Sequence, residues 1–177
     1  MTIYVTEYQS PVGPLFIGGT EDALYWVKYG TEHDLRDRFD RWLNQHFGNE
    51  TFVSNAEMLS DVTDQLDQYF HGDLTDFDLN FAFHGTTFQQ EVWQALLTIP
   101  YGETWSYLDI AQAIGRPKAV RAVGGAVNRN PFTVVVPCHR VIGKDGSLVG
   151  YGGGLDKKKT LLSIEMDSDS TSLHNML

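Results

Sequence analysis

The charged residues of this chain are distributed so unevenly that they divide it into two parts. Residues 1–83 contain fifteen acidic and four basic side chains, whereas residues 84–165 contain six acidic and nine basic ones. At 177 residues, the chain is long enough for two small domains with cores of their own. The asymmetry predicts units with different tasks over 1–80 and 81–166. The Ser- and Asp-rich tail over 167–177 is expected to be disordered.

The net charge excludes some partners for the chain as a whole but not for its second half. A formal charge of −10 argues against a polyanionic partner, because phosphate contacts require Lys and Arg. The second half is basic, however, and can contact nucleic acid. No apolar run reaches membrane-spanning length, and the first residues lack a basic segment followed by an apolar stretch. We therefore expect a cytoplasmic protein without membrane contact.

The first half has the pattern of an α/β scaffold. Apolar runs bounded by turn residues predict strands over 2–8, 15–18 and 23–29. Apolar residues that recur every four positions predict helices over 32–47 and 57–70. No segment here has the spacing of a catalytic or phosphate-binding motif. Its histidines, His33, His46, His71 and His84, are interpreted as ordinary polar residues, so no metal is predicted.

The second half carries start signals for two helices. Thr87 and Gln90 have the spacing of a capping box and predict a helix that continues to Ile99. Ser106 and Asp109 have the same spacing and predict a short helix through residue 114. These signals make the second half mostly helical.

A third helix is expected directly after the turn at residues 115–117. Pro117 suits the first position of a helix that runs to about Asn128. Two short helices about a Gly-containing turn form a helix-turn-helix. The third helix contains Gly124 and Gly125, each of which costs about 1 kcal/mol relative to Ala. Close approach of DNA explains them, and so does close packing against another helix; the sequence leaves both interpretations open.

The chain has a single cysteine, Cys138, which lies between an apolar run and the basic pair His139 and Arg140. One cysteine excludes an intrachain disulfide and fits a reducing compartment. Neighbouring positive charge increases the thiolate fraction, so Cys138 is a candidate nucleophile. A buried structural cysteine in a core strand is the alternative, and these residues alone do not decide between the two.

The last segments carry turn and helix signals. Asp145-Gly146 is typical of a hairpin turn, and the glycine cluster over 150–154 lacks the spacing of a phosphate loop. Asp156 is the expected cap of a final helix that ends near Glu165. The three lysines at 157–159 are expected to be solvated.

Five motifs together resemble the methylated-DNA–protein-cysteine methyltransferases, which repair O6-alkylguanine in DNA. They occur in the order and spacing of that family, and they are Tyr101-Gly102-Glu103-Thr104-Trp105-Ser106-Tyr107, Arg121-Ala122-Val123-Gly124-Gly125-Ala126, Asn130-Pro131, Pro137-Cys138-His139-Arg140-Val141 and Tyr151-Gly152-Gly153-Gly154-Leu155. The resemblance implies a ribonuclease-H-like α/β N-terminal domain, followed by a mostly helical domain with a helix-turn-helix. It also implies direct-reversal DNA repair.

The resemblance assigns catalytic roles to five residues. Cys138 takes the alkyl group permanently, so that the protein is consumed in one turnover. His139 is the base, acting through a water, and Glu165 orients its imidazole. Asn130 braces the turn that carries the cysteine. Tyr107 is the proton donor to the guanine ring.

The resemblance also implies the partner, which is double-stranded DNA containing O6-alkylguanine. The target nucleotide is flipped out of the stack, and Arg121 fills the space it leaves. The other DNA-contacting residues are Arg116, Lys118, Ala119, Ala122, Gly124 and Arg129. The pocket for the base is formed by Val127, Val141, Tyr151 and Gly152. A monomer without a cofactor is expected. The alternatives are a protein that recognises alkylated bases without transfer, and a thiol hydrolase.

Overall fold

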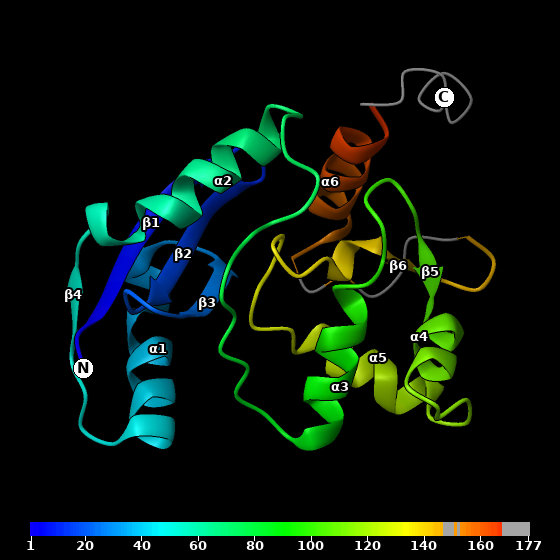
Figure 1. The fold of residues 1–177 in the computed structure, drawn as a ribbon, viewed down its shortest axis with the longest axis horizontal. Coiled ribbons are helices and arrows are strands. Elements are labelled where there is room, and N and C mark those ends of the chain that lie inside the picture. Colours follow the sequence, from blue (N-terminus) through cyan, green and yellow to red (C-terminus); the bar gives the residue numbers. More distant parts are fainter. Residues whose placement is uncertain (147–150, 152, 168–177) are drawn as a thin grey trace. The chain divides into compact units, whose positions relative to one another are not determined.

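The computed structural model describes residues 1–146, 151 and 153–167 of the chain. It forms two compact units, Met1–His84 and Gly85–Leu177. Figure 1 shows a sheet with helices in the first unit and mainly helices in the second. The predicted fold class is confirmed by these elements.

The first unit contains a four-stranded sheet in the order β3-β2-β1-β4. Its strands are β1 (Ile3–Ser10), β2 (Gly13–Gly19), β3 (Leu24–Tyr29) and β4 (Phe52–Ser54). The first three form an antiparallel meander, and β4 pairs in parallel with β1. The β1–β2 turn is closed by Ser10, whose Oγ donates to the carbonyl of Gly13 at 2.6 Å. Gly13 has a φ of 96°, which is why a glycine suits this turn.

Helices cover both faces of this sheet (Figure 1). They are α1 (Glu32–Phe47), the 3₁₀ turn η1 (Glu57–Leu59) and α2 (Ser60–Phe70). Phe16 of β2 packs edge-on against Phe39 of α1, while its neighbours Leu15 and Ile17, which point to the opposite face, are also buried. A sheet covered on both sides explains the continuous apolar run of β2.

Most elements of the first unit follow the sequence prediction. The helix predicted over 32–47 is α1, and it begins where Thr31 accepts a hydrogen bond from the amide of Asp34 at 3.1 Å. The helix predicted over 57–70 is divided into η1 and α2. The short strand β4 was not predicted, because its three residues are too few to show alternation.

The second unit is built from short elements. They are α3 (Thr87–Leu96), β5 (Trp105–Ser106), α4 (Tyr107–Ala113), α5 (Val120–Asn128), the 3₁₀ turn η2 (Cys138–Arg140), β6 (Val141–Ile142) and α6 (Leu155–Asp167). Trp93 of α3 donates from Nε1 to the carbonyl of Ala126 in α5 at 2.8 Å. β5 and β6 pair in parallel, which places the start of α4 beside the segment that follows Cys138.

The helix-turn-helix is formed by α4 and α5. The capping box predicted at Ser106 and Asp109 is present, with both reciprocal hydrogen bonds. The turn passes through Gly115 at a φ of 74°, and the amide of Arg116 returns to the carbonyl of Ala111 at 2.8 Å. These bonds fix the angle at which α5 leaves the turn.

Several helix limits differ from the prediction. The first capping box is formed by Thr86 and Gln89, one residue earlier than predicted, because Thr86 is the residue with extended backbone. The same helix ends at Leu96, before Ile99. Pro117 lies outside α5, since the amide of Ala119 bonds to the carbonyl of residue 116 and closes a turn first. Asp156 lies inside α6 and does not cap it.

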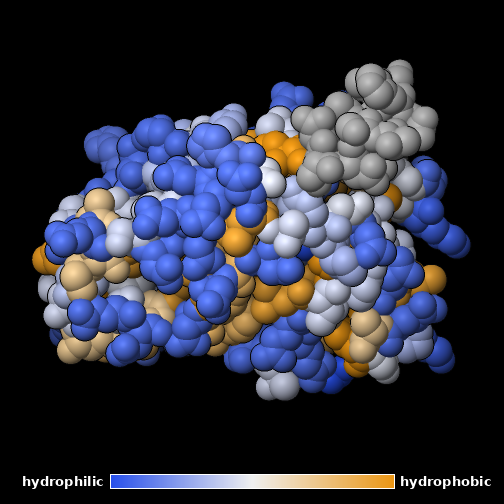
Figure 2. Space-filling view, turned by 45° about the horizontal axis from the view of Figure 1, so that its top comes forward, coloured by the Kyte–Doolittle hydropathy of each residue, from blue (hydrophilic) through white to orange (hydrophobic). Residues whose placement is uncertain are grey.

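Figure 2 shows hydrophilic residues over most of the face in view, with apolar residues in smaller patches between them. Within the described part of the chain, no helix is both long enough and apolar enough to cross a bilayer. Residues 168–177 of the predicted disordered tail lie outside the described residues.

Candidate active site and DNA-binding surface

The loop before Cys138 is buried but irregular. Asn130 holds it through its amide, which donates to the carbonyls of Val136 at 2.9 Å and Phe132 at 3.2 Å. Its Oδ1 accepts from the amide of Phe132 at 3.0 Å. Val134 has a φ of 72°, a conformation that costs a β-branched residue on the order of 1–3 kcal/mol. Strain of this kind is typical of functional segments, and a core strand is excluded here.

Cys138 opens η2 at the end of this loop and is 9% exposed. Its amide donates to the carbonyl of Val136 at 2.8 Å, and its own carbonyl accepts from the amide of Val141. Burial, and then charge on Cys138, raise the pKa of Tyr107. Tyr107, at the start of α4, therefore lies within electrostatic reach of the thiol.

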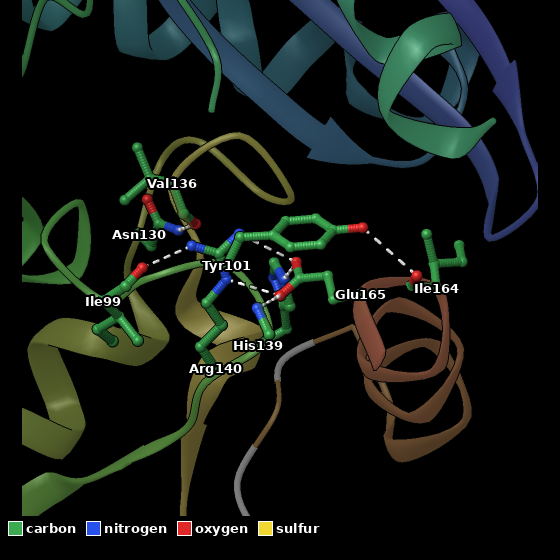
Figure 3. Close-up of polar contacts among 9 residues, drawn as sticks. Ile99, Tyr101, Asn130, Val136, His139, Arg140, Ile164 and Glu165 are labelled. Atoms are coloured by element: carbon green, nitrogen blue, oxygen red, sulfur yellow. Dashed lines mark hydrogen bonds and ion pairs between the residues drawn. The ribbon is translucent and has the colours of Figure 1, made fainter. Parts of the chain in front are cut away.

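His139 is completely buried, and its ring joins η2 to α6. Its Nε2 lies 2.5 Å from Oε2 of Glu165 (Figure 3). Its Nδ1 is the one buried side-chain nitrogen or oxygen in the described part of the chain that has no hydrogen-bond partner. Glu165 engages Nε2, so Nδ1 is the ring nitrogen left for proton exchange.

The charges around this pair are set by burial and by cations. Burial lowers the pKa of His139, an effect that Glu165 opposes and that Arg140 and Lys158 reinforce. Burial alone would raise the pKa of Glu165, but His139 and Arg140 lower it to about 2. At neutral pH the site therefore holds a neutral imidazole beside an ionised carboxylate, which is the arrangement of a base and its orienting group.

Arg140 is a member of this site that the sequence analysis did not assign. Its Nε donates to Oε1 of Glu165 at 2.7 Å and its Nη2 to Oε2 at 3.1 Å. Its Nη1 donates to the carbonyl of Ile99 at 2.6 Å, and its guanidinium lies over the ring of Tyr101 at 5.6 Å. Figure 3 shows these groups converging on Glu165. The fork of Arg140 fixes the carboxylate so that it faces His139.

Lys158 corrects the expectation that all three lysines of the last helix are solvated. It is 1% exposed, and its Nζ donates to the carbonyl of Val141 at 2.5 Å. The ammonium also lies 5.8 Å from the ring centre of Tyr151. Burial lowers the pKa of Lys158, and charge on Cys138 raises it. No spacing of residues in the sequence could have identified this lysine as buried, because its partners come from other segments.

One face of α5 is presented to solvent. Its exposed residues are Val120, Arg121, Ala122, Gly125 and Asn128, with Arg129 directly after them. Val123, Ala126 and Val127 are buried on the opposite face. A Cβ at Gly125 would meet nothing within 4 Å, so the protein's own packing does not require a glycine there. A Cβ at Gly124 would meet the Tyr107 ring at 3.9 Å, which is ordinary contact.

The remaining predicted residues lie in different surroundings. Arg116 is partly held by α3, since it lies 3.4 Å from the carboxylate of Glu91 and over the ring of Phe88. Lys118 is exposed, and Ala119 is half-buried in the turn. Of the predicted pocket residues, Val141 is buried, Tyr151 is half-buried, and Gly152 lies outside the described residues.

The histidines of the first unit do not form a metal site in the part of the chain that is described. No group of three or more His, Cys, Asp or Glu side chains there could hold a metal ion. His46 and His84 pack among aromatic rings: the ring of Trp42 lies 4.8 Å from His46 and 5.3 Å from His84. Burial, and then charge on His84, lower the pKa of His46.

Both units match family models along nearly their whole length. Residues 3–83 match the 6-O-methylguanine DNA methyltransferase, ribonuclease-like domain, and residues 87–167 match the 6-O-methylguanine DNA methyltransferase, DNA binding domain. The chain belongs to the 6-O-methylguanine DNA methyltransferase family. This confirms the family that the five motifs predicted, and it favours alkyl transfer over lesion recognition alone or thiol hydrolysis.

Individual members of the family align with more than nine-tenths of the chain. A methylated-DNA–protein-cysteine methyltransferase of Mycobacterium leprae is 48% identical over 97% of both chains. Another of Methanosarcina acetivorans is 45% identical over 92% of this chain and 98% of its own. Among solved structures, Mycobacterium tuberculosis OGT in complex with DNA is similar with a TM-score of 0.78 and 40% identity, covering 98% of this chain and 99% of that one.

Proposed function

We propose that this chain repairs DNA by direct reversal, transferring the alkyl group of O6-alkylguanine in double-stranded DNA to Cys138 in a single turnover. O4-methylthymine is a second substrate of the same chemistry. The observation that carries the proposal is the buried set of Cys138, His139 and Glu165, in which Nδ1 of the imidazole has no partner. Membership of the 6-O-methylguanine DNA methyltransferase family supports the same reaction.

The transfer step uses the charges of this site. Neutral His139 takes the proton of Cys138 through a water at Nδ1, while Glu165 holds Nε2 and stabilises the imidazolium that forms. Sγ attacks the alkyl carbon in line, the bond between that carbon and O6 breaks, and its electron pair moves onto the guanine. Tyr107 supplies a proton to the guanine ring, which makes it a better leaving group. Because the S–C bond is stable, each molecule acts once.

The DNA reaches Cys138 only if the damaged nucleotide leaves the duplex, since a stacked base cannot present its O6-alkyl carbon to a buried thiol. We assign the exposed face of α5 to the minor groove, with Arg121 in the space left by the nucleotide. The open surroundings of Gly125 support this, because a backbone without a side chain allows a close approach. Positive charge for the phosphates comes from Lys118, Arg129 and, in part, Arg116.

The flipped guanine is bound by a pocket of main-chain and apolar groups. The carbonyls of Cys138 and Val141 accept from its exocyclic amine, and Tyr151 and Val127 line it. We assign the contact with O6 to the amide of Gly152, a residue outside the described part of the chain. Asn130 acts indirectly, because it holds the strained loop that presents Cys138.

We further propose a division of labour between the two parts of the chain. Residues 1–80 serve as a scaffold, and residues 81–166 bind DNA and carry out the transfer. The protein acts as a monomer without a cofactor, in the cytoplasm, where its single thiol stays reduced.

The test is intact mass measurement with peptide mapping after the protein is mixed with a duplex that contains one O6-methylguanine. We expect a gain of one methylene unit on Cys138, never beyond one equivalent, and none with an unmodified duplex. Cys138→Ser is the control, which should bind the duplex and gain no mass. Tight lesion binding without a mass change would instead indicate a recognition protein, and repeated turnover of a small ester would indicate a hydrolase.

A further inference from the structure

Val134 has the only positive φ among the residues other than glycine in the described part of the chain, and it lies four residues before Cys138. Its φ of 72° is an outlier for a β-branched residue, because Cβ comes too close to the following carbonyl. Glycine accepts this conformation without that clash, yet the chain has valine here. The surroundings of Val134 should therefore indicate what its side chain contributes.

Hydrogen bonds around Val134 force the chain to turn there. The amide of Val136 donates to the carbonyl of Phe132 at 2.9 Å, so three residues must connect two points that are held together. Within this segment the amide of Val135 donates to the carbonyl of Thr133 at 2.8 Å. A bond of this span around a residue with positive φ is the rare, strained form of the γ-turn. The closure of the segment thus imposes the conformation of Val134.

A second turn connects the first to the cysteine. Pro137 has a φ of −82° and a ψ of 64°, and the amide of Cys138 donates across it to the carbonyl of Val136 at 2.8 Å. These angles belong to the common form of the γ-turn. The same carbonyl accepts from the side-chain amide of Asn130 at 2.9 Å. Because the second turn is fixed in this way, the conformation of Val134 determines where Sγ of Cys138 lies.

The side chain of Val134 opposes relaxation of the strained turn. It is 1% exposed, and a β-branched side chain has few rotamers with which to follow a change of the backbone. Rotation of φ to a negative value would move this side chain out of its packed position and leave a void. The burial of the side chain therefore holds a backbone conformation that valine alone disfavours.

We propose that Val134 is a positioning residue for alkyl transfer: its buried side chain holds the left-handed turn, and this turn sets the position of Sγ of Cys138. Only the identity of the transferred group rests on the proposed function. Alanine at this position keeps the strain and loses the packing that opposes it, whereas glycine also removes the strain. Glycine should therefore restore part of what alanine impairs, which is the opposite of the effect of lost volume.

The first measurement is urea unfolding, which needs no DNA. Val134→Gly should unfold at a higher urea concentration than Val134→Ala, because alanine at a positive φ is strained. Val135 is the matched control, since it is 3% exposed and does not have a positive φ. There the order should be reversed, because glycine loses more backbone entropy on folding than alanine does. If alanine is the more stable variant at both positions, no strain acts at Val134 and the proposal is wrong.

Amide hydrogen exchange of the peptide over 132–138 reports on the two turns directly. In Val134→Ala the amides of Val135 and Cys138 should exchange faster than in wild type, because both donate within the turns. Val134→Gly should exchange more slowly than Val134→Ala. Wild-type exchange in Val134→Ala would contradict the role of the side chain in holding the turn.

The third measurement is single-turnover transfer from an O6-methylguanine duplex at saturating DNA. Val134→Ala should be slower by on the order of tenfold to hundredfold, as a displacement of about 1 Å slows a positioned reaction. Val134→Gly should recover part of this loss. The Kd for the duplex should be unchanged in both variants, because a side chain this buried cannot reach DNA.

Rates that fall in the order valine, alanine, glycine would assign Val134 to packing alone. If neither small variant folds, Val134→Ile and Val134→Leu replace them. Only leucine, which is not branched at Cβ, should then slow transfer, and equal rates would overturn the proposal. If wild type itself takes no methyl group, the proposed function fails, and the unfolding and exchange measurements still decide whether Val134 holds the turn.

Discussion

Oε2 of Glu165 accepts from both Nε2 of His139 at 2.5 Å and Nη2 of Arg140 at 3.1 Å, so one carboxylate fixes the base and is itself fixed by a cation. Both bonds are buried, so solvent does not screen them. The carboxylate connects α6 to η2, and the stability of the second unit therefore depends on its ionisation.

That dependence predicts how the protein responds to acid. The pKa of Glu165 is lowered from 4.5 to about 2, so its charged form stabilises the fold fully above pH 4.5, and the stabilisation is lost as pH falls towards 2. Urea unfolding of wild type and Glu165→Gln should therefore differ most near neutrality and converge towards pH 2. A difference that does not change with pH would contradict this account.

Loss of the Asn130 side chain should destabilise the protein and slow the reaction of Cys138. Asn130→Ala leaves the buried amide of Phe132 and carbonyl of Val136 without their partner, and we expect a loss of about 2–4 kcal/mol in unfolding free energy. Asn128→Ala is the matched control on the exposed face of α5, and it should change stability by about 0.5 kcal/mol or less. Equal effects of the two substitutions would rule out a bracing role for Asn130.

Gly125→Ala should make the protein more stable and less able to bind DNA. A Cβ there meets nothing within 4 Å, so replacing a helical glycine should add up to about 1 kcal/mol of stability. By contrast, a Cβ at Gly18 would lie 2.5 Å from the ring of Phe39, and Gly18→Ala should destabilise by about 1–3 kcal/mol. Urea unfolding and the Kd for duplex DNA check both variants. Unchanged DNA affinity in Gly125→Ala would remove α5 from the interface.

Arg121→Ala should impair transfer from duplex DNA much more than transfer from a single strand. Filling the space of the flipped nucleotide offsets part of an unstacking cost of a few kcal/mol, so we expect a loss on the order of tenfold to hundredfold on the duplex only. Single-turnover rates on the two substrates measure this. Arg116→Ala controls for the removal of one positive charge and should slow both substrates equally. An equal loss on both substrates in Arg121→Ala would exclude the filling role.

The sequence was most informative where one segment determines its own structure. The spacing of Leu35, Phe39 and Leu43 predicted α1, and Ser106 predicted the start of α4, because helix periodicity and capping are local. The pairing of His139 with Glu165 came only from the resemblance to a family, since no local pattern connects residues 26 apart.

Two features could not be predicted from sequence for a physical reason. The positive φ of Val134 has no local signal, because valine disfavours it and the buried loop imposes it. Lys158 has the sequence context of a surface residue among three lysines, and partners from other segments, among them the carbonyl of Val141, make its burial tolerable. At both positions the tertiary structure overrides a preference of the residue type: that of valine for negative φ, and that of lysine for solvent exposure.

Because Glu165 lies in α6, which follows every other described element in the chain, the active site is completed late in folding. Cys138, His139 and Arg140 precede α6 in the chain, so His139 and Arg140 cannot contact Glu165 until α6 has been made and has docked. Until Glu165 follows, the imidazole lacks its orienting partner and the guanidinium lacks its counter-ion. A chain that lacks α6 therefore carries the Cys138 thiol without the carboxylate that orients its base. The active site is complete only when α6 has docked.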